Sequence, residues 1–374
     1  MFSSNILKNE EKAVFALRSL YRKYGYTPFK MSKFEEYDLY VRNKDFLVSD
    51  SVITFTGMNG KLLALKPDVT LSIVKNTKDL PDTVQKVYYN ENVYRVSKNT
   101  HEFKEIMQTG LECIGAIGIY DIYEVISLAA KSLGAISESF VLDLSHIGIV
   151  SAVLDSIGCS RDTGKKILTC IGEKNQSDIE KICAENNISG EDCEKIVSLV
   201  GTYGRIEKVI PELRAICDTP ELKSALAEFE SICALLISSE FSDKINIDFS
   251  IATDMRYYNG VVFQGFVENV PTGVLSGGQY DNLMKKMGRK SGAIGFAVYL
   301  DTLERLNLVE KKYDVDCILL YDGSTEPADL ANTVNKLIAD GREVMVQKAL
   351  PENIKYKQLL KINGKEVDEL ENND

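Results

Sequence analysis

Four short segments of this chain set polar side chains among apolar residues of the kind that form strands. In one of them, Gln108, Gly110 and Glu112 are spaced two apart, so all three lie on one face of a strand. The glycine leaves room between an amide and a carboxylate, so this face could form the floor of a binding site for a small polar ligand. A buried carboxylate needs a partner, and a ligand ammonium or imidazolium group would supply one. The four segments are residues 66–70, 107–115, 257–263 and 276–281.

The charged candidates also have structural interpretations, which the sequence leaves open. Asp68 could cap the start of a short helix, where an acidic side chain suits the helix dipole. Glu112 could form a salt bridge within the fold. Arg95 could pair with a carboxylate of the sheet as easily as with a ligand.

The uncharged candidates leave the same choice. Tyr257 and Tyr258 could be plain core aromatic residues, and only one of two adjacent strand residues can face a pocket. The pair Gly277 and Gly278 could form only a turn, so the helix expected near residue 280 need not hold a ligand. His146 is more typical of a hydrogen-bonded structural histidine than of a catalyst.

Composition restricts the chemistry that is available. Only two histidines occur in 374 residues, and the eight cysteines form no Cys-x-x-Cys pair. Few residues are therefore available for a zinc site or for histidine-based acid–base catalysis, and we expect no metal or cofactor. Scattered cysteines in a chain of this size without a secretion signal are typical of reduced thiols, so we expect a cytoplasmic protein.

Charge and hydropathy indicate which partners to expect. The formal net charge is −11 at pH 7, whereas nucleic-acid binding requires clustered Lys and Arg side chains to neutralise phosphates. We therefore do not expect a nucleic-acid partner. The N-terminus has no apolar core of a signal peptide, and no stretch approaches the roughly 18 apolar residues that cross a bilayer.

Apolar periodicity and turn residues place the first two segments in an α+β layer of antiparallel strands with helices on one face. A hairpin is expected around the turn pair Asn59–Gly60. The expected order is a helix at 6–24, the hairpin strands at 52–55 and 61–65, a short helix opening near 68, strands at 86–96 and 106–114, a helix at 120–133 and a strand at 140–144.

Strand patterns stop after this first part of the core (residues 1–147), and we expect an all-helical insert at 148–240. The core resumes at 241–312, with strands at 245–248 and 257–267, a helix at 280–287, and the run 292–297 leading into a helix through 306. A small α/β tail follows at 313–374. We expect it to be βαβ-like, with elements at 315–320, 328–339 and 342–346 and a frayed acidic end at 364–374.

These segments resemble the catalytic core of the histidyl-tRNA synthetases, in the branch that includes the regulatory subunit of ATP phosphoribosyltransferase. Six motifs occur in the family's order, which is far more specific than any one of them. The resemblance implies a class II synthetase-like antiparallel sheet flanked by helices. The matching residues are Pro28 in the first, dimer-interface motif, Asp68 and Thr70 in the element that binds the histidine amino group, Gln108 and Glu112 in the pair that contacts histidine, the segment 144–148 just before the insert, the tyrosine pair Tyr257 and Tyr258, and the loop at 277–281.

Two departures from the family pattern concern its reaction with ATP. Thr253 stands where the synthetases carry the arginine that stabilises the α-phosphate, and Arg256 lies an odd number of residues away, on the opposite face of a strand. Ser97 replaces the carboxylate that contacts adenine. Losing one charged transition-state contact typically costs about 3–4 kcal/mol. The tail also resembles a shortened anticodon-binding domain.

The resemblance therefore implies a non-catalytic regulatory subunit of ATP phosphoribosyltransferase, which acts at the first step of histidine biosynthesis. It would form a homodimer within a hetero-oligomer containing the short-form catalytic subunit, activate that subunit and mediate feedback inhibition by L-histidine. The alternatives are a divergent histidyl-tRNA synthetase and a free-standing synthetase-like binding module. The implied histidine-binding residues are Asp68, Thr70, Arg95, Gln108, Glu112, Tyr257 and Tyr258, with Gly277, Gly278 and Tyr280 in a pocket loop; no residue is assigned a catalytic role.

Overall fold

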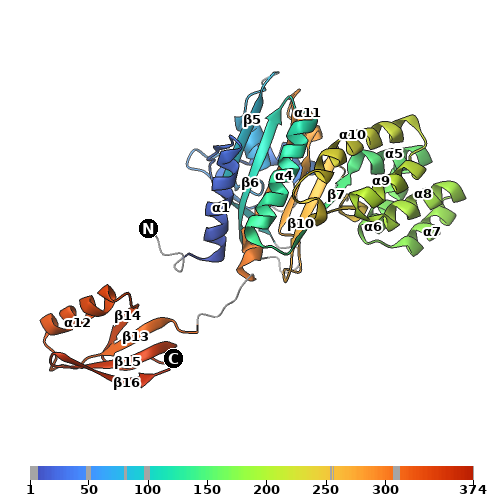
Figure 1. Cartoon of the computed structure of the whole chain (residues 1–374). Helices are drawn as coiled ribbons and strands as arrows, with labels where there is room; N and C mark the ends of the chain where they lie inside the picture. The colour runs from blue at the N-terminus through green and yellow to red at the C-terminus, as the bar shows by residue number, and fades with distance from the viewer. Residues whose placement is uncertain are drawn as a thin grey trace. The chain divides into compact units, whose positions relative to one another are not determined.

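A computed structural model of the chain describes residues 7–47, 52–79, 82–96, 102–252, 255, 257–305 and 312–373 (Figure 1). The chain divides into two compact units, residues 1–306 and 307–374. Within the described residues, no helix is both long and apolar enough to cross a membrane.

The first unit is built on a nine-stranded sheet, whose order is β1-β5-β6-β12-β11-β10-β7-β9-β8. The central strands pair antiparallel, as the sequence predicts, whereas β1 with β5 and β7 with β9 pair parallel. The sheet is therefore mixed. Its strands are β1 (Thr27–Pro28), β5 (Val84–Val96), β6 (Phe103–Gly115), β12 (Gly292–Tyr299), β11 (Leu275–Gln279), β10 (Val261–Val267), β7 (Phe140–His146), β9 (Ile245–Asp248) and β8 (Tyr203–Arg205).

Helices α1 (Asn9–Lys23) and α4 (Ile119–Ile136) cover one face of this sheet (Figure 1). The predicted amphipathic pattern of α1 is confirmed, because Leu17 and Tyr21 are fully buried in the core between sheet and helices. Leu111 and Cys113 of β6 face this core. Since strand residues alternate, Gln108, Gly110 and Glu112 point to the opposite face.

The opposite face is covered by a small sheet and short helices, which share a second apolar cluster with Tyr89 and Ile114. The predicted hairpin around Asn59–Gly60 is confirmed as part of this sheet. The helix expected near residue 68 begins at Thr70. These elements are β2 (Phe34–Glu36), α2 (Tyr37–Arg42), η1 (Lys44–Phe46), β3 (Thr54–Thr56), β4 (Leu62–Leu65), α3 (Thr70–Asn76) and α11 (Asp281–Lys286).

Six helices form the insert between β7 and β9. Four of them begin at a Ser, Thr or Asn whose side chain caps the helix, which explains why the sequence signals them clearly. The insert is not purely helical, because the three-residue strand β8 extends the main sheet beside β9. Its helices are α5 (Ile147–Ile157), α6 (Arg161–Gly172), α7 (Gln176–Glu185), α8 (Gly190–Gly201), α9 (Ile206–Ile216) and α10 (Pro220–Ile237); the 3₁₀ turns η2 (Ser242–Lys244) and η3 (Phe249–Ile251) follow.

The second unit is a four-stranded sheet with one helix. Its strand order is β14-β13-β15-β16, so the expected βαβ arrangement is present and two further strands are added. The acidic end is not frayed: it pairs antiparallel with the preceding strand, and Gln358 donates to Glu369 across the pair. The elements are β13 (Val315–Leu320), α12 (Pro327–Ala339), β14 (Val344–Gln347), β15 (Tyr356–Asn363) and β16 (Glu366–Asn372).

In the first unit, the 3₁₀ helix η4 (Leu300–Arg305) replaces the helix predicted through residue 306.

Glycine is required where β5, β6 and β12 approach one another. A Cβ on Gly110 would lie 2.6 Å from the Tyr89 hydroxyl and would clash with the Phe296 carbonyl oxygen. The Tyr89 hydroxyl itself donates to that carbonyl across 3.5 Å. Gly110 therefore makes room for a tyrosine that crosses the polar face of the sheet.

Replacing Gly110 by alanine should lower the free energy of unfolding by about 1–3 kcal/mol, because the added methyl group overpacks this position. Gly190→Ala is the matched control, since a Cβ there meets nothing within 4 Å, and it should change stability by less than about 0.5 kcal/mol. Urea unfolding measures both. Equal stability of the two variants would contradict the close strand packing.

Candidate functional site

A cavity of about 220 Å³ lies on the polar face of the main sheet. Its floor is formed by β5, β6, β11 and β12, and its walls come from the start of α3 and the segment before β10. All seven residues predicted to bind a ligand line it, together with Tyr280. The lining residues are Asp68, Val69, Thr70, Tyr89, Arg95, Gln108, Glu112, Tyr257, Tyr258, Ser276, Tyr280, Gly295, Phe296, Ala297 and Tyr299.

Glu112 stands at one end of this cavity and is only 2% exposed. Its Oε1 accepts a hydrogen bond from the Thr70 hydroxyl at 2.8 Å, and its Oε2 accepts one from the Tyr280 hydroxyl at 2.5 Å. Any Cβ on Gly295 would clash with this carboxylate, so the glycine creates its space. Burial raises the pKa of Glu112 to about 8, although both hydrogen bonds act in the opposite direction. No cation pairs with Glu112 within the described residues.

Asp68 and Arg95 bring opposite charges to the other part of the cavity. Asp68 accepts the backbone N–H of Leu71 at 2.9 Å, so it stabilises the start of α3 and lines the cavity as well. Burial raises the pKa of Asp68, while the Leu71 hydrogen bond and the charge of Arg95 act to lower it. Arg95 donates through Nε to the Pro67 carbonyl oxygen at 3.0 Å and has no ion pair within the described part of the chain.

Gln108 is buried on the floor between these charged groups. Its register partner on β12 is Tyr299, whereas that of Glu112 is Gly295. The Gln108 amide forms no hydrogen bond with the described residues. It is therefore available to a ligand, both as a donor and as an acceptor.

Tyr257 and Tyr258 both line the cavity, which corrects the expectation that only one of them could. That expectation assumed a strand from residue 257, but β10 begins only at Val261. The alternation rule does not apply to the irregular segment before it. The two rings lie 4.7 Å apart between centroids at an interplanar angle of 62°.

The two glycines of the expected pocket loop lie in strand β11 and do not line the cavity. A Cβ on Gly278 would lie 2.7 Å from the ring of Tyr258, so this glycine leaves room for that wall residue. Gly277 faces the apolar side of the sheet, where a Cβ would lie 2.8 Å from the ring of Phe263.

The predicted binding residues did not include Gly295 and Tyr299, nor Ser276, although Ser276 begins one of the four segments. Gly295, Ala297 and Tyr299 are spaced two apart in β12, so period-two alternation places them on one face. That signal could not show that β12 pairs with β6, which is what brings them beside Gln108 and Glu112. The expected substitutions at Thr253 and Ser97, and Arg256, lie outside the described residues.

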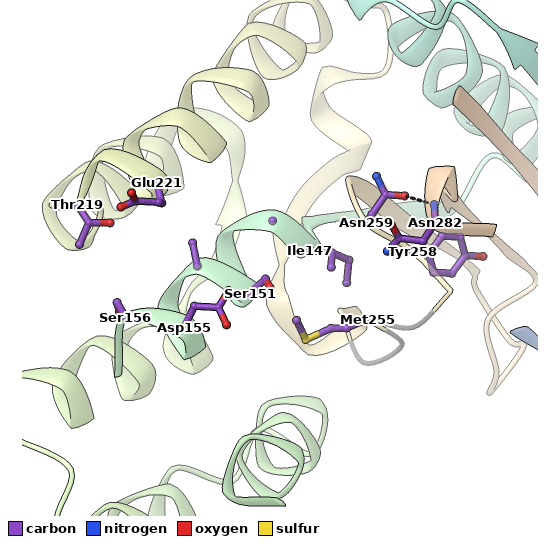
Figure 2. A pocket seen from close by; sticks show the side chains of 12 residues that line it. Ile147, Ser151, Asp155, Ser156, Thr219, Glu221, Met255, Tyr258, Asn259 and Asn282 are labelled. Carbon is purple, nitrogen blue, oxygen red and sulfur yellow. Dashed lines mark hydrogen bonds between the residues drawn. The ribbon is translucent and has the colours of Figure 1, made fainter. Parts of the chain in front are cut away.

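A larger cavity of about 660 Å³ adjoins the first and shares Tyr258 with it (Figure 2). It lies between α5, the start of α10 and the loop that carries Asn259, whose side-chain oxygen accepts the Asn282 backbone N–H. Apart from Tyr258, the ionisable residues on its described wall are the acidic Asp155 and Glu221. It does not offer the opposite charges that the smaller cavity offers.

His146 lines neither cavity. It is buried against Phe229, and burial lowers its pKa to about 4. Its ring nitrogens form no hydrogen bond with the described residues, although Nε2 lies 3.9 Å from a carboxylate oxygen of Glu228. The hydrogen bond expected of a structural histidine is therefore not present. No group of three or more His, Cys, Asp and Glu side chains suited to a metal ion occurs in the described chain.

The smaller cavity is thus complementary to a zwitterion. It presents a guanidinium group, two carboxyl groups and a free amide within a space of about seven water molecules at liquid density. An amino acid with a polar side chain carries the matching set of carboxylate, ammonium and side-chain hydrogen-bonding group.

The buried Glu112 should make stability depend on pH. Between the ordinary pKa of 4.5 and about 8, the unfolded chain ionises while the folded chain keeps its proton, so the free energy of unfolding falls as pH rises. Glu112→Gln removes this pH dependence, because glutamine does not ionise. The free energy of unfolding of the variant minus that of wild type should therefore be about 3 kcal/mol larger at pH 8 than at pH 5, as measured by urea unfolding. A difference that stays constant with pH would contradict the assignment.

Comparison with known proteins identifies the family. A family model described as histidyl-tRNA synthetase matches residues 5–303. An ATP phosphoribosyltransferase regulatory subunit from Clostridium botulinum is 29% identical over 329 residues, which cover 85% of this chain and 77% of the relative.

Solved structures share the fold. A Bacillus halodurans protein described as an ATP phosphoribosyltransferase regulatory subunit/histidyl-tRNA synthetase is 24% identical, with a TM-score of 0.75 and coverage of 94% of this chain and 93% of that one. A chain of an ATP phosphoribosyl transferase complex from Thermotoga maritima is 22% identical, with a TM-score of 0.61 and coverage of 78% and 97%. The main sheet and its helices therefore form a class II aminoacyl-tRNA synthetase-like fold. Because the family model spans most of its length, the chain belongs to the histidyl-tRNA synthetase family.

Proposed function

We propose that this chain is a non-catalytic, histidine-sensing regulatory subunit of ATP phosphoribosyltransferase. One observation carries the proposal: the pocket of a histidyl-tRNA synthetase fold keeps every predicted amino-acid contact in one cavity of about 220 Å³. The names of the curated relatives support the choice of enzyme complex. A cytoplasmic location fits a subunit of a biosynthetic enzyme.

Histidine fits the charges of the pocket in one orientation. Its carboxylate pairs with Arg95 of β5 and the Gln108 amide of β6, because both line the part of the cavity away from Glu112. Its ammonium group pairs with Asp68, which is buried and faces the cavity. The imidazole then reaches Glu112 at the far end, where it forms a hydrogen bond with the carboxyl group. The contacts to Arg95 and Asp68 are charge-assisted hydrogen bonds, which are the stronger class in proteins.

The same cleft lacks two groups that the synthetase reaction uses. Thr253 and Ser97 replace, by family resemblance, a phosphate-binding arginine and an adenine-binding carboxylate. Binding without activation leaves the free energy of histidine binding available for regulation. A coupling free energy of about 1–3 kcal/mol to the partner would be typical, and it is reciprocal.

The second candidate is a divergent histidyl-tRNA synthetase, which family membership and the retained pocket favour. Histidine-dependent exchange of pyrophosphate into ATP separates the two. We expect wild-type protein to show no exchange above background, because both charged contacts are absent. Histidine binding, measured by calorimetry on the same preparation, is the control for folded protein. Measurable exchange would favour the synthetase.

Reconstitution with a short-form catalytic subunit tests the regulatory role. The wild-type chain should raise ATP phosphoribosyltransferase activity, and histidine should lower it again. Glu112→Gln should raise the histidine concentration for half-inhibition by about 10- to 100-fold, since the imidazole loses its carboxyl hydrogen-bond partner. The catalytic subunit assayed alone, with and without histidine, is the control. A chain that neither binds nor activates the partner would contradict the proposal.

A further inference from the structure

Tyr299 is a residue of the pocket that the histidine contacts do not use. It is the last residue of β12, and it lines the cavity together with Ser276 of the neighbouring strand β11. The two hydroxyl groups share a hydrogen bond of 2.7 Å. The phenol ring therefore spans from β12 to β11 across the polar face of the sheet.

The strand register shows which end of the cavity Tyr299 occupies. Tyr299 pairs with Gln108, and Glu112 lies four residues further along β6, roughly 13 Å away. Arg95 pairs with Lys104, on the side of Gln108 away from Glu112. Tyr299 thus stands at the end where Arg95 and Gln108 take the ligand carboxylate.

The position of Tyr299 is fixed from several directions. Its backbone N–H donates to the Val274 carbonyl at 2.8 Å, and its carbonyl accepts the Thr302 hydroxyl at 2.5 Å. With Ser276 holding the phenol hydroxyl, the ring has little freedom to move aside.

We propose that Tyr299, held by Ser276, is the specificity-determining residue that closes the carboxylate end of the pocket, so that the site admits a free amino acid and excludes one whose carboxylate carries a bulky group. This inference rests on the proposed function, because it assumes that the pocket binds histidine. Activation by ATP joins the carboxylate to a phosphate, so the nucleotide must lie at this same end. The closed end therefore opposes adenylation independently of Thr253 and Ser97.

Three ligands and two variants test the proposal by calorimetry on the full chain. Titration with L-histidine tests whether the pocket binds the free amino acid. L-histidinamide and L-histidine β-naphthylamide both lack the carboxylate charge, so the ratio of their dissociation constants isolates the effect of bulk. In wild-type protein the naphthylamide should bind about 10- to 100-fold more weakly, the usual consequence of overpacking.

Tyr299→Ala should reduce this ratio to within about threefold, whereas Tyr299→Phe should keep it because the ring remains. Equal binding of the two amides by wild-type protein, or an unchanged ratio in Tyr299→Ala that still binds histidine, would overturn the role of Tyr299 alone. Failure of wild-type protein to bind histidine would overturn the proposed function. Where Tyr299→Ala does not fold, equal binding of the two amides by wild-type protein still overturns the proposal.

Discussion

The structure of the pocket depends on how one buried carboxyl group is accommodated. Glu112 accepts hydrogen bonds from the hydroxyl groups of Thr70, in α3, and of Tyr280, just before α11. Gly295 on β12 has no side chain and so leaves room for the carboxyl group. Residues 70, 280 and 295 must therefore all be correctly placed around residue 112 to provide these contacts. Two hydroxyl donors do not offset the cost of burying a charge, so the group holds its proton near neutral pH. A ligand that hydrogen-bonds to this carboxyl group adds to the two contacts that the fold supplies.

This arrangement separates binding from chemistry. The polar face of the sheet supplies a fixed set of charges on rigid strands, which suits recognition of a small zwitterion. Reaction with ATP needs in addition open space and positive charge beside the ligand carboxylate. Tyr299 lines the cavity, and in our proposal it fills that space. By family resemblance, Thr253 stands where the synthetases carry an arginine. The proposed regulatory role requires recognition of the zwitterion and does not require reaction with ATP.

Much of this could be predicted from the sequence, for identifiable reasons. Period-two alternation correctly places Gln108, Gly110 and Glu112 on one face, and the loss of strand patterns after residue 147 marks the start of the largely helical insert. Strand pairing could not be predicted, because it depends on contacts between distant segments; Gly295 and Tyr299 were missed for that reason. The acidic strand β16 was missed because its exposed side chains carry no apolar pattern.

Calorimetric titration of the full chain with L-histidine, compared with Glu112→Ala, tests the central claim most directly. Truncation leaves the Thr70 and Tyr280 hydroxyl groups without their acceptor and the ligand without its carboxyl partner. We expect wild-type protein to bind histidine and the variant to bind it about 10- to 100-fold more weakly or not at all. Equal affinities, or no binding by wild-type protein, would contradict the claim that this carboxyl group is the centre of an amino-acid pocket.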